Sequence, residues 1–213
     1  MRFQQIFFII ALMALLISPN YLAGEEKNPL SRFDAQQLKK LKAGEPVCTV
    51  KLNSEEANAT AGEGYCTIII NAPIDKCFEI IVKIDEQVYY VPNKTKSDIV
   101  SREGNRLLID NVYRYYGTTT AYHSIYTIFD KNYRMEYEID QSRPHDLAEN
   151  SGFYQFVKID RQNTLLTYGS TRLDVGFNVP EFVKKIMLGK SLPAMAINIK
   201  KYIESNGEWR QGK

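Results

Sequence analysis

VPEFVKKIMLGKSLPAMAINIKKYIES, residues 179–205, is a helix-like segment that follows a long series of strand-like segments. Its apolar residues recur every three or four positions, as on the face of an amphipathic helix. One terminal helix after many strands is typical of a curled antiparallel sheet closed by that helix. The segment therefore predicts an α+β fold that encloses a space between sheet and helix.

The same segment contains a phase change that predicts a break or sharp kink. At about 100° per residue, its two apolar stripes point in nearly opposite directions. Gly189 is a typical helix stop, and Ser191 is a typical N-cap that leaves Pro193 in a first helical turn. We therefore expect a flap over 180–188 and a lid over 192–205. The stripes consist of Phe182, Val183, Ile186 and Met187, and of Leu192, Met195, Ala196, Ile199 and Ile203.

Length and composition indicate one globular domain with a hydrophobic core. The chain has 213 residues, of which 44% are hydrophobic and 24% are charged. Its 27 Lys and Arg against 25 Asp and Glu give a net charge of +2, which is too balanced to favour nucleic acid as a partner. Tyrosine dominates the aromatic residues, with 14 Tyr, 10 Phe and one Trp. Tyrosine suits apolar surfaces that need a hydrogen-bonding tip.

Residues 1–24 have the pattern of a secretory signal peptide. Arg2 supplies a positive charge, residues 6–17 are continuously apolar, and residues 22–24 supply small side chains for cleavage. The apolar run is shorter than the roughly 20 residues that span a bilayer. We expect an exported, periplasmic or secreted protein with no stable membrane span after cleavage. The alternative is an uncleaved N-terminal anchor.

Export makes a disulfide possible between two of the three cysteines. Cys48 and Cys66 lie in strand-like runs that flank a polar loop at 53–64. If the runs pair as a hairpin centred near Ala57, the two cysteines face each other. They are then either a disulfide or two ordinary strand cysteines. Cys77 lies on an apolar helical face, where we expect it to be buried and inert.

The other segments form a helical extension, two helices and six strands. Residues 25–46 are an N-terminal extension with an amphipathic helix at 31–42, and 207–213 are a polar tail. A helix is expected at 74–84, with a short second helix at 85–91. The period then changes to two, and turn residues separate the runs, as in an antiparallel meander. The six strands are expected at 96–102, 105–115, 120–129, 133–139, 152–159 and 164–175.

Alternation assigns the faces of these strands. Met135 and Tyr137 alternate with charged residues and must face inward. A two-residue turn at 131–132 pairs Tyr137 with Tyr126 and brings Tyr126 inward too. Each unpartnered buried hydroxyl costs about 1–3 kcal/mol, which favours a partly wet cavity; the alternative is a core whose hydroxyls reach the rim or the backbone. The candidate ligand-binding residues are Tyr113, Tyr115, Tyr122, Tyr126, Met135, Tyr137, Phe153, Met195 and Ile199.

Several short phrases, in their order and spacing, carry a family resemblance. They are INAPIDKCF at 70–78, ID at 84–85 with YVP at 90–92, SRPHD at 142–146 with GFYQF at 152–156, NTLLTY at 163–168 and VPEF at 179–182. On these phrases, residues 47–206 resemble the START-like or SRPBCC (helix-grip) superfamily, with its polyketide cyclase/dehydrase and coenzyme Q-binding groups. The resemblance implies a curved antiparallel sheet wrapped around the C-terminal helix, with a cavity between them. It implies a hydrophobic ligand, because members bind lipids, quinones, sterols or polyketides, and it transfers no catalytic residue.

The sequence offers little that favours catalysis, a metal or a cofactor. His123 points to the convex face by the alternation, and no Cys, His and carboxylate cluster has the spacing of a metal site. No nucleotide-binding or nucleophile motif occurs, so we expect no cofactor. Residues 143–146, Arg-Pro-His-Asp, lie in the longest loop of the meander. They are either an acid–base pair at the cavity mouth or a solvated loop in which Asp146 caps a turn.

Three functions stay open from the sequence. The first is a monomeric exported carrier of a lipid, quinone or sterol-like molecule, which contacts membranes only transiently. The second is a cyclase or aromatase that uses tyrosine hydroxyls with His145 and Asp146. The third is a protein-interaction module with an apolar convex patch that includes Ile125 and Phe129. We rank binding first because no convincing acid–base pair lies inside the predicted cavity.

Overall fold

The computed structural model describes most of the chain after the expected leader. It covers residues 28–52, 61–115, 117–174 and 181–212, and gives the backbone alone for 52, 61, 62, 115 and 181–188. The predicted signal peptide lies outside the described residues. Among the helices within these ranges, none is both long and apolar enough to cross a membrane.

The described residues form several short helices and eight strands, followed by one long terminal helix. In chain order the elements are α1 (Ala35–Lys42), β1 (Val47–Leu52), β2 (Ala61–Ile70), α2 (Ile74–Ile81), the 3-10 helix η2 (Ile84–Tyr89), β3 (Lys94–Glu103), β4 (Arg106–Tyr115), β5 (Thr118–Phe129), the 3-10 turn η3 (Asp130–Asn132), β6 (Arg134–Ile139), β7 (Glu149–Lys158), β8 (Thr164–Asp174) and α3 (Glu181–Glu204). The predicted helices and strands are therefore present, with ends that differ by a few residues.

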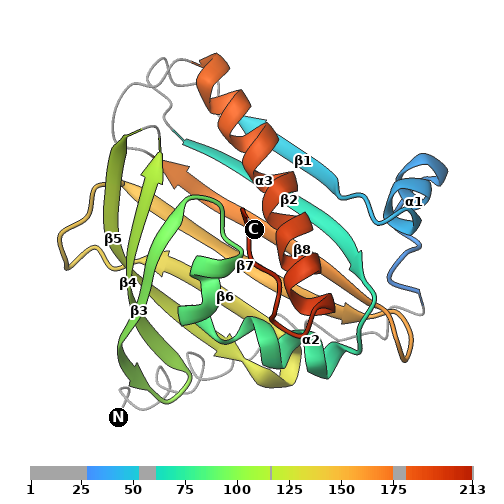
Figure 1. Ribbon diagram of the computed structural model, residues 1–213. Helices are drawn as coiled ribbons and strands as arrows, with labels where there is room; N and C mark the ends of the chain where they lie inside the picture. The colour runs from blue at the N-terminus through green and yellow to red at the C-terminus, as the bar shows by residue number, and fades with distance from the viewer. Residues whose placement is uncertain (1–27, 53–60, 116, 175–180, 213) are drawn as a thin grey trace, which may run out of the picture.

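The strands form one antiparallel sheet in the order β1-β2-β8-β7-β6-β5-β4-β3. β3 to β8 follow one another as the predicted meander. β2 pairs with β8, and this long-range pairing joins the N-terminal hairpin to the end of the meander. The curved sheet wraps around α3, and α2 lies at one end of the same face (Figure 1). The predicted α+β, helix-grip architecture is confirmed.

The inner face of the sheet follows the predicted alternation. Tyr126 pairs with Tyr137, and Ile128 pairs with Met135, across β5 and β6. All four side chains are buried. Because side chains in a strand alternate with a period of two, a shift of one residue would have turned all of them outward. The connecting turn η3 ends at Tyr133, which takes a positive φ of 47°.

The terminal helix α3 runs without interruption through Pro193 (Figure 1). The predicted break and separate flap are therefore wrong. A proline in a helix interior costs about 3 kcal/mol, because it removes one backbone donor and crowds the preceding turn. Burial of a large apolar side chain stabilises by about 1.5–3 kcal/mol, so several on one helix face offset that cost. The buried residues of α3 after Gly189 are Leu192, Met195, Ala196, Ile199, Tyr202 and Ile203.

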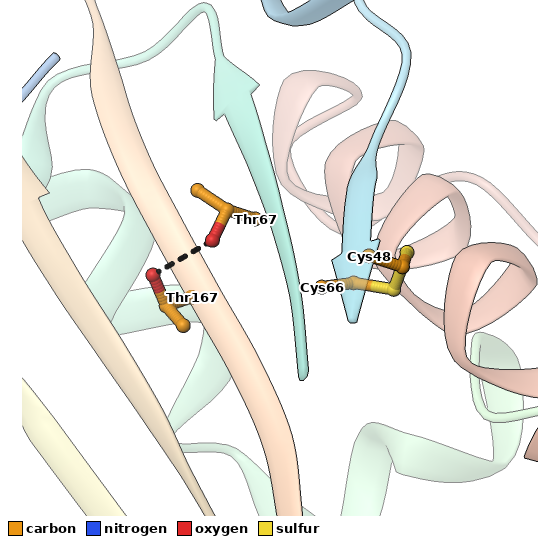
Figure 2. Close-up of a disulfide and its surroundings, with 4 residues drawn as sticks. All are labelled: Cys48, Cys66, Thr67 and Thr167. Carbon is orange, nitrogen blue, oxygen red and sulfur yellow. Dashed lines mark hydrogen bonds between the residues drawn. A yellow bond between two sulfur atoms is a disulfide. The ribbon is translucent and has the colours of Figure 1, made fainter. Parts of the chain in front are cut away.

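A disulfide joins β1 to β2 near the core. Cys48 and Cys66 are direct cross-strand partners, and their Cα atoms lie 4.0 Å apart. Figure 2 shows the disulfide beside α3, and the hydrogen bond between Thr67 and Thr167 on the other side of β2. Of the two alternatives for this cysteine pair, the structure has the bonded one. Cys77 of α2 is a buried free thiol, and burial raises its pKa to about 11, so it stays protonated at neutral pH.

The segment after α3 packs against η2. The backbone N–H of Gln211 donates to the carbonyl of Tyr89 at 2.9 Å. The guanidinium of Arg210 lies 3.8 Å from the centroid of the Tyr89 ring, a cation–π contact. Residues 207–212, which we expect from the sequence to be a polar tail, therefore make specific contacts with the domain.

Candidate ligand-binding site

Buried aromatic and apolar side chains line the inner face of the sheet beneath α3. Met195 and Ile199 of α3 belong to the same buried cluster as Met135 of β6. Apart from Tyr202 of α3, the buried tyrosines of this cluster follow η2 or lie on β5, β6 and β7. We use the name tyrosine interior for seven of these buried residues. They are Tyr90, Tyr126, Tyr137 and Tyr154, each at most 8% exposed, with Met135, Met195 and Ile199.

Four tyrosine rings form a row across β5 to β8. The ring centroids are 5.6 Å apart for Tyr126 and Tyr137, 6.1 Å for Tyr137 and Tyr154, and 4.9 Å for Tyr154 and Tyr168. Gly152 lies opposite Tyr137, where a Cβ would stand 2.4 Å from the Tyr137 hydroxyl oxygen. The glycine therefore leaves the space that the tyrosine uses. Aromatic pairs of this kind contribute about 0.5–1.5 kcal/mol each beyond burial.

Burial keeps these tyrosines protonated. Desolvation raises the pKa of Tyr126, Tyr137 and Tyr154 above the ordinary value. The Tyr126 hydroxyl donates to Oε1 of Gln87, on η2, at 3.2 Å. At neutral pH these three tyrosines therefore offer hydrogen-bonding hydroxyls and apolar rings, but no phenolate base.

Lys94, the first residue of β3, is the one lysine that the described part of the sheet buries. Its surface is 3% exposed, and burial lowers its pKa to about 7. Its Nζ donates to Oε1 of Gln87 at 2.5 Å and lies 5.5 Å from the ring centroid of Tyr113. Gln87 thus accepts from both Lys94 and Tyr126, which ties this amine to the tyrosine interior.

Three polar atoms near this end of the domain are buried without a hydrogen-bond partner among the described residues. They are Nε2 of Gln87, the hydroxyl of Tyr90 and Oδ1 of Asn111. The Asn111 amide nitrogen is used, because it donates to the Ser124 hydroxyl at 3.2 Å. Unsatisfied buried polar atoms are uncommon in folded proteins and indicate a missing partner, such as water or a ligand.

The structure brings together most of the predicted ligand-binding residues. Tyr113 and Tyr122 form a separate stacked pair on β4 and β5, with centroids 5.7 Å apart, and the Tyr122 hydroxyl accepts from Asn150 at 2.9 Å. The side chain of Tyr115 lies outside the described residues. The predicted residues within the tyrosine interior are Tyr126, Met135, Tyr137, Met195 and Ile199.

The prediction for Phe153 is wrong, because this residue lies on the outer face of the sheet. The register opposes Tyr154 to Met135, which puts Tyr154 and Phe156 inside. The Phe153 ring instead stacks under Arg134, whose guanidinium carbon lies 4.5 Å from the ring centroid. Both residues line an outer hollow of about 280 Å³. Both faces of β7 carry aromatic residues, so alternation alone did not distinguish them.

Sequence reasoning missed Lys94, Gln87 and Tyr90. A β-bulge between Lys94 and Lys96 shifts the register of β3 against β4. It buries Lys94 and Ser97 while Lys96 stays partly exposed, although simple alternation puts the two lysines on one face. A bulge of this kind leaves no clear signal in a polar sequence.

The loop that carries His145 and Asp146 is tied to the sheet as a turn. The Asp146 carboxylate accepts from the backbone N–H of Ala121 at 2.7 Å, and its own N–H donates to the carbonyl of Ala121 at 3.0 Å. His145 bonds through Nδ1 to the carbonyl of Arg143 at 2.7 Å. These contacts favour the turn-capping interpretation over an acid–base pair. Within the described ranges, no three His, Cys or carboxylate side chains are grouped to hold a metal.

The comparisons with known proteins agree with this architecture. The sequence matches no family model and no curated protein. A START superfamily protein from Mycobacterium smegmatis is similar with a TM-score of 0.56 at 14% identity, over 76% of this chain and 99% of that one. A STAR-related lipid transfer protein from Xanthomonas axonopodis gives 0.58 at 10% identity, over 73% and 93%. The Zhui aromatase/cyclase from Streptomyces gives 0.50 at 16% identity, over 68% and 86%. The chain therefore has the START-like, helix-grip fold.

Proposed function

We propose that this protein is an exported START-like carrier that holds a hydrophobic or amphipathic small molecule between the sheet and α3. The observation that carries the proposal is the tyrosine interior, in which buried tyrosines of the sheet share one cluster with Met195 and Ile199 of α3. A lining of this composition suits a lipid, quinone or sterol-like body, with a few polar groups to fix its head. The pattern of a signal peptide at residues 1–24 supports export.

The proteins with a similar fold support the binding of a hydrophobic small molecule. Two of them are a START superfamily protein and a STAR-related lipid transfer protein, and the third is an aromatase/cyclase. A cyclase needs an acid–base pair placed against its substrate. Asp146 is engaged with Ala121, and the interior tyrosines are protonated at neutral pH, so carriage fits these residues better than catalysis.

The test is to identify what the purified protein carries. The chain would be exported by its own leader, purified without detergent, extracted with organic solvent and analysed by mass spectrometry. We expect one class of apolar or amphipathic molecule in near-stoichiometric amount. A folded wild-type protein that yields no molecule, and takes none from phosphatidylcholine vesicles, would refute the proposal.

A matched pair of substitutions gives the control. Ile199→Trp adds bulk at a fully buried position of α3, whereas Ile99→Trp makes the same change at a position of β3 that is 45% exposed. We expect the first variant to lose the bound molecule and the second to keep it. Circular dichroism of both variants verifies that the comparison is made between folded proteins.

A further inference from the structure

Lys94 is a buried cation for which the described part of the chain supplies no anion. It takes part in no ion pair there, whereas its neighbour Lys96 pairs with Asp98 and Asp110. An isolated buried charge costs several kcal/mol, and buried charges in proteins are therefore normally paired. Lys94 therefore has no counter-charge among the described residues, and an anionic ligand would supply one.

The groups around Gln87 include buried hydrogen-bond donors that lack an acceptor among the described residues. An ammonium only donates, so the Gln87 amide must turn its oxygen towards Nζ and its Nε2 away. Tyr126 donates to the same oxygen. Nε2 of Gln87 and the hydroxyl of Tyr90 then remain buried without a partner within the described structure. Nε2 of Gln87 needs an acceptor, and the Tyr90 hydroxyl can donate to one, so one acceptor group would satisfy both atoms.

This donor cluster, Lys94, Gln87 and Tyr90, adjoins the tyrosine interior. Tyr126 connects the two, because its hydroxyl bonds to Gln87 and its ring stacks on Tyr137. A molecule with an acceptor at one end and an apolar body would meet donors first and aromatic rings next. A carboxylate is the acceptor that also carries the missing charge, and its two oxygens accept several hydrogen bonds.

We propose that the donor cluster binds the carboxylate of a long-chain monocarboxylic acid, whose chain lies in the tyrosine interior. This inference rests on the proposed carrier function and names the polar group of its ligand. A sterol hydroxyl or a quinone carbonyl would accept from one or two donors but would leave Lys94 without a counter-charge.

The test compares palmitic acid with hexadecanol, two ligands with equal chain length and different head groups. Each would be offered in phosphatidylcholine vesicles, and the amount taken up by the protein would be measured by mass spectrometry. We expect wild type to prefer the acid by about tenfold or more, the usual worth of a buried charge-assisted hydrogen bond. In Lys94→Met, uptake of hexadecanol should persist and the preference for the acid should disappear. Lys96→Met, with a partly exposed lysine, should keep the preference.

The outcomes separate the two proposals. Uptake of both ligands without preference by wild type is compatible with the carrier function but overturns the carboxylate site. This result is expected if a bound water, and not a carboxylate, satisfies the donor cluster. Uptake of neither ligand by folded wild type counts against the carrier function itself. A folded Lys94→Met variant that loses both ligands equally also overturns the carboxylate site, because Lys94 would then act only on the shape of the interior.

Discussion

Replacing Lys94 by methionine should change how the stability of the protein depends on pH. The amine has an ordinary pKa of 10.5, and burial lowers this to about 7 in the folded chain. Because a tenfold change in proton affinity is worth about 1.4 kcal/mol, holding Lys94 charged in the folded state costs about 5 kcal/mol. Methionine fills a similar volume without a charge, so it removes this cost.

The sign and the pH window follow from the two pKa values. Between pH 7 and pH 10.5 the unfolded chain holds the Lys94 proton and the folded chain has largely released it. The unfolded state therefore binds more protons, and the stability of wild type rises with pH across this window. The penalty is fully present below pH 7 and is relieved above pH 10.5. From pH 7 to pH 9, wild type should gain about 2 kcal/mol relative to Lys94→Met.

The assay is urea unfolding of both proteins from pH 6 to 9, after bound molecules have been removed. Other titrating groups cancel in the difference between the two proteins. The side chains next to Nζ do not interfere, because Gln87 does not titrate and burial raises the pKa of Tyr126. Lys96→Met is the control, since that lysine is paired with Asp110 and its pKa is raised. Parallel pH profiles for wild type and Lys94→Met would refute the reasoning.

Three further predictions concern stability. Reduction of the Cys48–Cys66 disulfide, which closes a loop of 18 residues, should lower the free energy of unfolding by about 3 kcal/mol in urea titrations with and without dithiothreitol; equal midpoints would contradict this. Gly152→Ala should cost more than about 3 kcal/mol, because its Cβ would lie 2.1 Å from a backbone oxygen, whereas Gly189→Ala meets no neighbour and should stabilise α3 by about 0.5–1 kcal/mol in thermal unfolding. Met135→Ala should cost about 2–5 kcal/mol, because Met135 is fully buried, and a change below 1 kcal/mol would indicate a looser interior.

The sequence determined the features that depend on local periodicity. The alternation around Met135 and Tyr137 predicts their inward orientation, and a short turn predicts the pairing of Tyr137 with Tyr126, because side chains of a strand alternate with a period of two. The cross-strand position of Cys48 and Cys66 follows from the same symmetry of a hairpin. The presence of the terminal helix follows from its apolar spacing.

The tertiary structure decided what these local patterns leave open. Pro193 continues α3, because packing of the helix face against the sheet outweighs a local helix-breaking tendency. The choice between Phe153 and Tyr154 depends on the register of β7 against β6, since both faces of β7 are aromatic. The pairing of β2 with β8 brings together segments about 100 residues apart, which no local pattern specifies.

The donor cluster shows most clearly which features cannot be predicted from the sequence. Lys94 and Lys96 are indistinguishable by residue type, and only a bulge in β3 buries one and leaves the other at the surface. Gln87 meets Lys94 because η2 packs against β3 in the folded domain. The sequence therefore predicts an apolar, tyrosine-lined interior by periodicity, whereas the buried charge beside it depends on backbone irregularity and long-range packing, which act only in the folded chain.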